Sequence, residues 1–129
     1  MILSGGCFTS GKEQIMRILV ANTLLMYRET LALAILRHNA NFEVMIADPA
    51  SLDGEAERFA PNALVRDDDG IVVSAPYGVV CWVGIIIDNH LKARISVDGQ
   101  VSEIHEVSID EMLAALDETA MLLSEDGAR

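Results

Sequence analysis

The stretch GCFTSGKE, residues 6–13, is the first place in the chain where residue types and spacing suggest chemistry. A phosphate-binding loop has the pattern G-x-x-x-x-G-K-[ST], in which the last hydroxyl ligates magnesium. Both glycines and the lysine fit, but Glu13 stands where the hydroxyl is required. Such a loop must also open a helix, whereas residues 14–21 form a strand-like run. We therefore interpret residues 1–15 as a flexible N-terminal extension and not as a phosphate site.

A second candidate is the acidic cluster Asp67-Asp68-Asp69, which follows a short apolar run. Carboxylates are the ligands that magnesium prefers, so the cluster could bind a cation. An acidic turn that ends in Gly70 has the same appearance and needs no function. The sequence leaves both interpretations of this cluster open.

The remaining polar candidates are isolated side chains. Asp88, His90 and His105 would form a metal site only if a loop folded onto the next hairpin, and ordinary surface histidines explain them better. Cys81 lies in an apolar run, where a free cysteine behaves as a small buried hydrophobic residue. No serine is tied to a base, so no hydrolytic triad is indicated. We expect no enzymatic activity, no metal and no cofactor.

Composition restricts the classes of function further. The chain has 129 residues and a formal net charge of −11, and 51% of its residues are hydrophobic. The length predicts one domain, and the charge argues against nucleic-acid binding by this chain alone. No apolar run reaches the roughly 18 residues of a membrane span, and two cysteines make no disulfide framework, which favours a reducing cytoplasm. The high apolar fraction favours a homodimer or another homo-oligomer.

The elements that must position these residues alternate in type along the first half of the chain. Short apolar runs typical of buried strands alternate with helical patterns, and we expect strands at residues 17–21, 42–47 and 62–66 and helices at residues 24–39 and 51–60. This alternation predicts an α/β domain with a parallel sheet. The carboxyl ends of parallel strands meet at one edge, so a ligand site is expected there.

The second half of the chain follows a different pattern. Residues 79–87 are the most apolar run and predict a central strand. Asp98-Gly99 is the signal for a two-residue turn, and pairing Val97 with Gln100 places the charged side chains of residues 91–107 on one face of a hairpin. Ser108 begins a C-terminal helix through a capping box with Glu111. Residues 16–129 are thus expected to form a single domain, with a frayed end after residue 123.

The first half resembles a known family. The stretch MRILVANTLLMYRETLALAIL, Met16–Leu36, resembles the first strand and helix of response-regulator receiver domains, and PNALVRDDDG, Pro61–Gly70, resembles their third strand. The resemblance implies a flavodoxin-like three-layer fold and a role in signalling or transcriptional control. It also implies that Asp67 occupies the position of the phosphoacceptor.

Several receiver features are missing. The family needs two acidic residues after its first strand to hold magnesium, and here these positions are Asn22 and Thr23. No hydroxyl residue ends the strand at 79–87, and Lys92 stands at the start of the following strand instead of its end. The hairpin at residues 91–107 occupies the place of a helix. The chain therefore resembles a degenerate receiver, a pseudo-receiver.

The hypothesis that follows is a non-catalytic regulatory interaction domain that acts through self-association or a protein partner. Two alternatives stay open. One is an atypical receiver that is phosphorylated on Asp67. The other is a small-ligand sensor whose site lies at the mouth formed by the strand ends, with the side chains of Asn22, Thr23, Asp48, Arg66 and Asp67.

Overall fold

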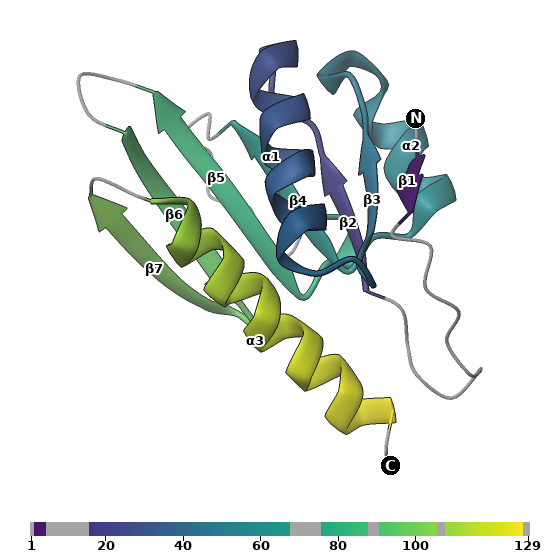
Figure 1. Cartoon of the computed structure of the whole chain (residues 1–129), viewed down its shortest axis with the longest axis vertical. Helices are drawn as coiled ribbons and strands as arrows, with labels where there is room; N and C mark the ends of the chain where they lie inside the picture. The colour runs from purple at the N-terminus through teal and green to yellow at the C-terminus, as the bar shows by residue number, and fades with distance from the viewer. Residues whose placement is uncertain (1, 5–15, 68–75, 88–90, 106–107, 128–129) are drawn as a thin grey trace.

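The computed structural model describes residues 2–4, 16–67, 76–87, 91–105 and 108–127 (Figure 1). The chain forms one sheet with the strand order β1-β3-β2-β4-β5-β6-β7. The strands are β1 (Ile2–Ser4), β2 (Arg17–Val20), β3 (Glu43–Ile46), β4 (Ala63–Asp67), β5 (Cys81–Ile87), β6 (Leu91–Val97) and β7 (Gln100–His105). The helices are α1 (Leu25–His38), α2 (Leu52–Phe59) and α3 (Ile109–Gly127), with short 3-10 turns η1 (Pro49–Ser51) and η2 (Pro76–Gly78).

The sheet is mixed, and its centre is parallel. Strands β3, β2, β4 and β5 run parallel to one another, whereas β6 and β7 continue the sheet in antiparallel pairs. Strand β1 pairs antiparallel with β3 at the opposite edge. The α/β class, with parallel pairing in the N-terminal half and a C-terminal helix, is therefore confirmed. Part of the expected extension, Ile2–Ser4, contributes an edge strand.

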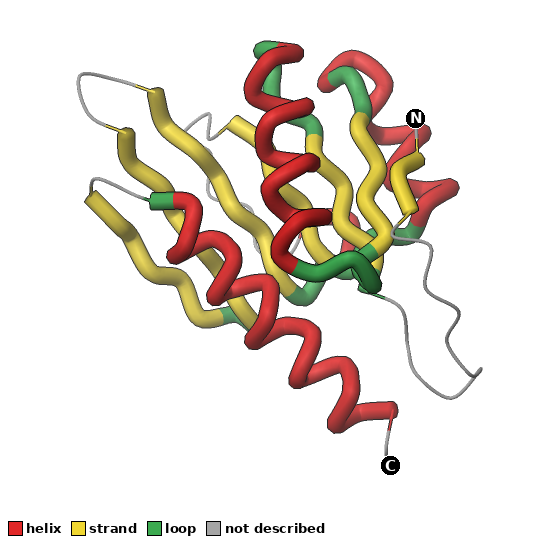
Figure 2. The backbone as a smooth tube through the Cα atoms, in the orientation of Figure 1, coloured by secondary structure: helices red, strands yellow, loops and turns green. Residues whose placement is uncertain are grey.

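Helices cover both faces of the sheet (Figures 1 and 2). Alternate residues of each strand point to opposite faces, so Ile18 and Val20 pack under α1 and α3 while Leu19 packs against α2. The α1–α3 side holds the larger apolar cluster, which includes Leu116 of α3 and Val83 of β5. None of the helices that the structure describes has the length and apolar character needed to cross a membrane.

The predicted hairpin is confirmed residue by residue. Val97 pairs with Gln100 and Arg94 with Glu103 across β6 and β7. Asp98 and Gly99 both have positive φ, at 52° and 85°, as the two central positions of this turn require. The turn chemistry and the alternation of the strands agree, which fixes the register.

Two details of the helices differ from the prediction. The helical spacing of the apolar residues in 24–39 predicts that Leu24 and Tyr27 lie on the buried side and Arg28 off it, but Leu24 is 54% exposed, Tyr27 is 40% exposed and Arg28 is buried. The helix is apolar on several sides, so the sequence pattern alone does not determine which side faces the sheet. Helix α3 continues to Gly127, past the point where fraying was expected.

Candidate functional site

The side chains predicted to form a ligand mouth do follow the carboxyl ends of parallel strands. Asn22 and Thr23 come directly after β2, Asp48 follows β3, and Arg66 and Asp67 are the last two residues of β4. Strand β2 lies between β3 and β4. The sheet therefore places all five positions along one edge, and their contacts divide them into two groups.

The first group is centred on the carboxylate of Asp67. The Asn22 side-chain amide donates a hydrogen bond to Oδ1 of Asp67 at 3.0 Å, and the backbone N–H of Thr23 donates to Oδ2 at 3.0 Å. Asn22 is only 1% exposed, so its amide is held in place by packing. Both carboxylate oxygens thus have donors from the end of β2.

These contacts change the acidity of Asp67. Partial burial raises its pKa, but hydrogen bonds from the Thr23 side chain, the Asn22 amide and the Thr23 backbone, together with the charge of Arg66, outweigh that effect. The pKa of Asp67 therefore lies below its ordinary value of 3.8. The carboxylate is ionised at neutral pH and is stabilised by N–H donors.

The same carboxylate lies at the beginning of α1. The N-cap residue Leu24 makes no side-chain hydrogen bond, and the first turn of α1 contains no acidic residue. The N-cap position belongs to Leu24 and not to Thr23, whose backbone N–H is bonded to Asp67. Negative charge is favourable at a helix N-terminus. The carboxylate of Asp67, at the end of β4, therefore supplies the negative charge that the first turn of α1 lacks.

The second group joins Asp48 to α1. Oδ1 of Asp48 accepts a hydrogen bond from Ala50 N at 2.9 Å, and its Oδ2 lies 4.0 Å from Nη1 of Arg28. The Arg28 side chain is only 10% exposed, whereas that of Asp48 is 64% exposed. Asp48 therefore pairs with Arg28, a residue that the sequence pattern did not single out.

Arg66 lies close to two ionisable groups. Its positive charge contributes to lowering the pKa of Asp67 and acts in the same direction on Tyr77. The Tyr77 hydroxyl donates to Asp53 of α2, and this hydrogen bond, followed by burial and the charge of Asp53, raises the pKa of Tyr77 above 10.0. The charge of Arg66 therefore acts near the Tyr77–Asp53 hydrogen bond, which joins η2 to α2. The carboxylate of Asp67 lies instead at the start of α1.

Two buried polar atoms at this edge lack a partner. Among the residues that the structure describes, neither Oδ1 of Asn22 nor Nε of Arg28 accepts or donates a hydrogen bond. An unsatisfied buried polar group costs free energy. These two atoms, one an acceptor and one a donor, can therefore still form hydrogen bonds with a polar ligand.

An apolar groove lies on the α1–α3 face of the sheet. It has a volume of about 200 Å³ and separates the first half of α1 from the start of α3. Its floor comes from β5 and β6, where Ile85 pairs with Asp67 on the neighbouring strand. The lining residues are Tyr27, Thr30, Leu31, Val83, Ile85, Ala93, Ser108, Ile109 and Met112.

Comparison of this chain with protein-family models, with curated proteins and with solved structures found no match. The interpretation of the site therefore rests on its own geometry. In that geometry the positions that would supply two magnesium ligands in a receiver instead supply two N–H donors to Asp67. The N–H groups that face Asp67 cannot ligate a cation, and neither residue supplies a carboxylate, so the residues present do not fit the two-carboxylate magnesium site that the resemblance implies.

The other candidates of the sequence divide into two sets. The glycine-rich stretch at residues 6–13, together with Asp68, Asp69, Asp88 and His90, lies outside the described residues. His105 is exposed on β7, 3.7 Å from Glu103. Within the described ranges no three metal-ligating side chains gather into one group.

Cys81 is a buried core residue of β5. Burial is the main cause that raises the pKa of its thiol, and the charge of Glu118 adds to it, while a hydrogen bond from Thr119 opposes it. The resulting pKa is about 11. A thiol that stays protonated at neutral pH is a poor nucleophile, in agreement with the expected structural role.

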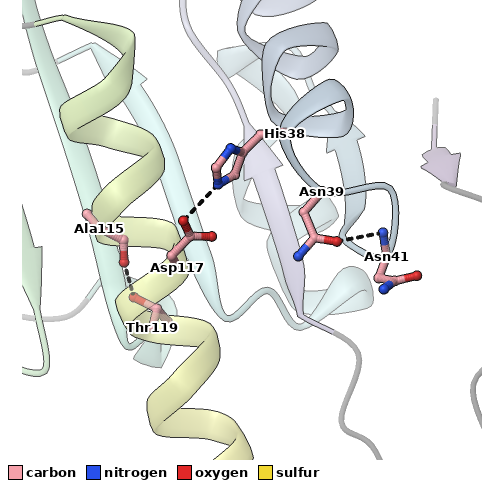
Figure 3. A network of polar contacts seen from close by, with 6 residues as sticks. All are labelled: His38, Asn39, Asn41, Ala115, Asp117 and Thr119. Atoms are coloured by element: carbon pink, nitrogen blue, oxygen red, sulfur yellow. Dashed lines mark hydrogen bonds and ion pairs between the residues drawn. The ribbon is translucent and has the colours of Figure 1, made fainter.

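Polar contacts connect α1 and α3 at the end away from the mouth (Figure 3). Nε2 of His38, the last residue of α1, lies 2.7 Å from Oδ2 of Asp117 on α3. On α3 itself, the hydroxyl of Thr119 donates to the carbonyl oxygen of Ala115 at 2.9 Å. The two helices are therefore joined by a direct side-chain contact at one end, and the apolar groove lies between them toward the other.

Proposed function

We propose that this chain is a non-catalytic regulatory interaction domain of the pseudo-receiver type, which acts through self-association or a protein partner. The observation that carries the proposal is the bonding of Asp67. Its carboxylate accepts N–H donors from Asn22 and Thr23 on both oxygens. A phosphoacceptor needs an accessible carboxylate oxygen and a cation beside it. In this chain both oxygens of Asp67 accept hydrogen bonds, and the neighbouring residues supply N–H groups in place of cation ligands.

The order of the parallel strands supports the receiver-like part of the proposal. Numbered by their own sequence, the parallel strands β2 to β5 lie in the order 2-1-3-4. Flavodoxin-like sheets begin in this order and bind ligands at the carboxyl ends of their strands. The antiparallel β6–β7 hairpin replaces the next strand–helix unit of that pattern, which fits a domain that lost its phosphate chemistry.

The surface supports the interaction part of the proposal. Three consecutive apolar side chains, Leu24, Leu25 and Met26, are each more than half exposed. Contiguous exposed apolar residues on the surface of a small domain often mark a protein interaction site. We place this role in the cytoplasm, where the free thiol of Cys81 would stay reduced.

A titration with magnesium and beryllofluoride, a mimic of the phosphoryl group, tests the proposal. The single tryptophan, Trp82, pairs with Leu64 on the strand that ends at Asp67, so its fluorescence can report a change at that strand. We expect no saturable change in fluorescence with either the wild type or Asp67→Asn. A saturable change in the wild type that disappears in Asp67→Asn would show a working phosphoacceptor and refute the proposal.

The unsatisfied atoms of Asn22 and Arg28 favour a small-ligand sensor as the second candidate function. A ligand that offers a donor to Asn22 Oδ1 and an acceptor to Arg28 Nε would satisfy both buried atoms. A thermal-shift screen of small polar metabolites against the wild type and Arg28→Met tests this candidate. A compound that raises the melting temperature of the wild type but not of the variant would favour the sensor. If the screen finds no such compound, the interaction domain is the better proposal.

A further inference from the structure

We propose that two copies of this chain form a twofold dimer in which the first turn of α1 from each copy enters the α1–α3 groove of the other. The inference deepens the proposed function, on which it rests, by naming a second copy as the partner and this surface as the interface. We call residues 24–27 the apolar knob.

The apolar knob is exposed far beyond what the fold requires. Leu25 is 55% exposed and Met26 75% exposed, while Leu24 and Tyr27 are 54% and 40% exposed. All four are large and apolar, and they follow one another in the chain. Runs of three or four exposed apolar residues are avoided in soluble proteins unless they have a binding function.

The volume of the groove suits side chains better than a small-molecule ligand. Sites for drug-sized ligands occupy about 300–1,000 Å³, whereas this groove has about 200 Å³ and is almost entirely apolar. Binding anchors of protein partners are single large side chains that fill desolvated pockets of this kind. The groove is therefore suited to receive one or two side chains such as those of Leu25 and Met26.

The knob and the groove belong to the same patch of surface. Tyr27 is both the last residue of the knob and the first residue of the groove lining. Figure 1 shows α1 and α3 diverging toward the first turn of α1, with β5 between them. A projection beside a hollow on one surface is what a twofold interface needs, because each copy then offers both parts to the other.

Net charge restricts the part of the surface through which two copies can meet. The chain has a net charge of −11, which opposes contact between copies over most of the surface. The first turn of α1 is an exception, since it contains no acidic residue. On the far wall, Asp110 and Glu111 are exposed beside Ile109, and in a dimer we expect them at the solvated rim.

Sedimentation velocity over a range of protein concentrations tests the dimer. We expect the wild type to dimerise reversibly and Met26→Glu to weaken the dimer at least tenfold, the loss typical of an anchor residue. Met121→Glu is the matched control, because Met121 is also highly exposed, at 66%, but lies nine residues beyond the groove residue Met112 on α3. All variants should melt like the wild type, since the changed positions are exposed.

A mixing experiment separates this geometry from other dimers. Met26→Glu damages the knob and leaves the groove, whereas Ile109→Glu damages the groove and leaves the knob. One buried glutamate is enough to break a contact, so each variant alone has no intact knob-and-groove contact, whereas a mixed pair has both substitutions in one contact and keeps the other intact. We therefore expect the mixture to dimerise more tightly than either variant alone. Failure of the mixture to recover, or a wild-type dimer that Met26→Glu does not weaken, would overturn this geometry.

A wild-type chain that stays monomeric at every concentration would overturn the dimer itself. That result would leave the proposed function open to another protein partner. The beryllofluoride titration judges the proposed function separately, because it measures phosphoryl chemistry at Asp67 and not association.

Discussion

Asp67 shows how the residue types at positions 22 and 23 decide what the end of a strand can bind. Acidic residues at positions 22 and 23 would repel its carboxylate and require a cation between them. Asn22 and the backbone of Thr23 instead donate hydrogen bonds to it directly. Hydrogen bonds to a charged group contribute about 1.5–3 kcal/mol each to stability. These hydrogen bonds connect the end of β4 to the residues that precede α1.

The first prediction concerns the pH dependence of this contact. The folded state lowers the pKa of Asp67 below 3.8, so the unfolded carboxyl group binds a proton more readily than the folded one. The stabilisation is therefore complete above about pH 4, near the ordinary aspartate value, and is lost as pH falls through the lower folded-state pKa. We expect Asp67→Asn to lower the free energy of unfolding by about 1–2 kcal/mol at pH 7, because an asparagine side chain can accept only one of the two hydrogen bonds.

Urea denaturation of the wild type and Asp67→Asn across the acid range checks this prediction. Taking the difference between the two proteins cancels the other acidic groups. The difference should shrink as the pH is lowered below 4. A difference that stays constant down to the acid transition would show that the ionised carboxylate contributes nothing to the contact.

The residues of the mouth could be predicted because strand ends are easy to locate in this sequence. Asn22, Thr23 and Asp67 each follow or end a short apolar run, and parallel strands bring such positions to one edge. Arg28 could not be predicted in the same way. Its burial depends on how α1 is rotated about its axis and on the place of Asp48 after β3, and both are properties of tertiary packing.

Helix α1 illustrates the same limit for a whole element. Its bounds were expected at residues 24–39 and are Leu25–His38, because helix length follows from local pattern. The prediction of its buried side was wrong at Leu24, Tyr27 and Arg28, since apolar residues occur almost all around the helix. The hairpin of β6 and β7 is the opposite case, because a two-residue turn and strict alternation leave one register possible.

The second prediction tests the buried arginine of α1. Nε of Arg28 has no partner among the described residues, and Asp48, whose Oδ2 lies 4.0 Å from Nη1 of Arg28, is mostly exposed. Burying a charge with so little compensation costs free energy. We expect Arg28→Met, which keeps the aliphatic packing, to leave the free energy of unfolding unchanged or to raise it by about 1 kcal/mol.

Chemical denaturation monitored by circular dichroism measures this effect, with Leu31→Ala as the control. Leu31 lies on the same buried side of α1, and its truncation should cost about 2–5 kcal/mol. A clear loss of stability in Arg28→Met, comparable to that of the control, would mean that the guanidinium group makes a contact of structural importance at the mouth.

For the molecule as a whole, charge and apolar surface act against each other. Twenty acidic residues against nine basic ones keep copies of the chain apart. The apolar knob and the groove bring them together at the first turn of α1, which contains no acidic side chain. Association of two copies should therefore depend on how strongly the solvent screens their like charges.

The last prediction follows from this balance. Added sodium chloride shortens the range of the repulsion between two copies from about 30 Å at 0.01 M to about 10 Å at 0.1 M. The apolar contacts of the interface do not weaken under the same change. We expect the dissociation constant of the dimer to fall as salt rises and to level off once the charges are screened, as measured by sedimentation velocity. A dimer that dissociates with added salt would be held by opposite charges, which the surface of the knob does not supply, and would place the interface elsewhere on the molecule.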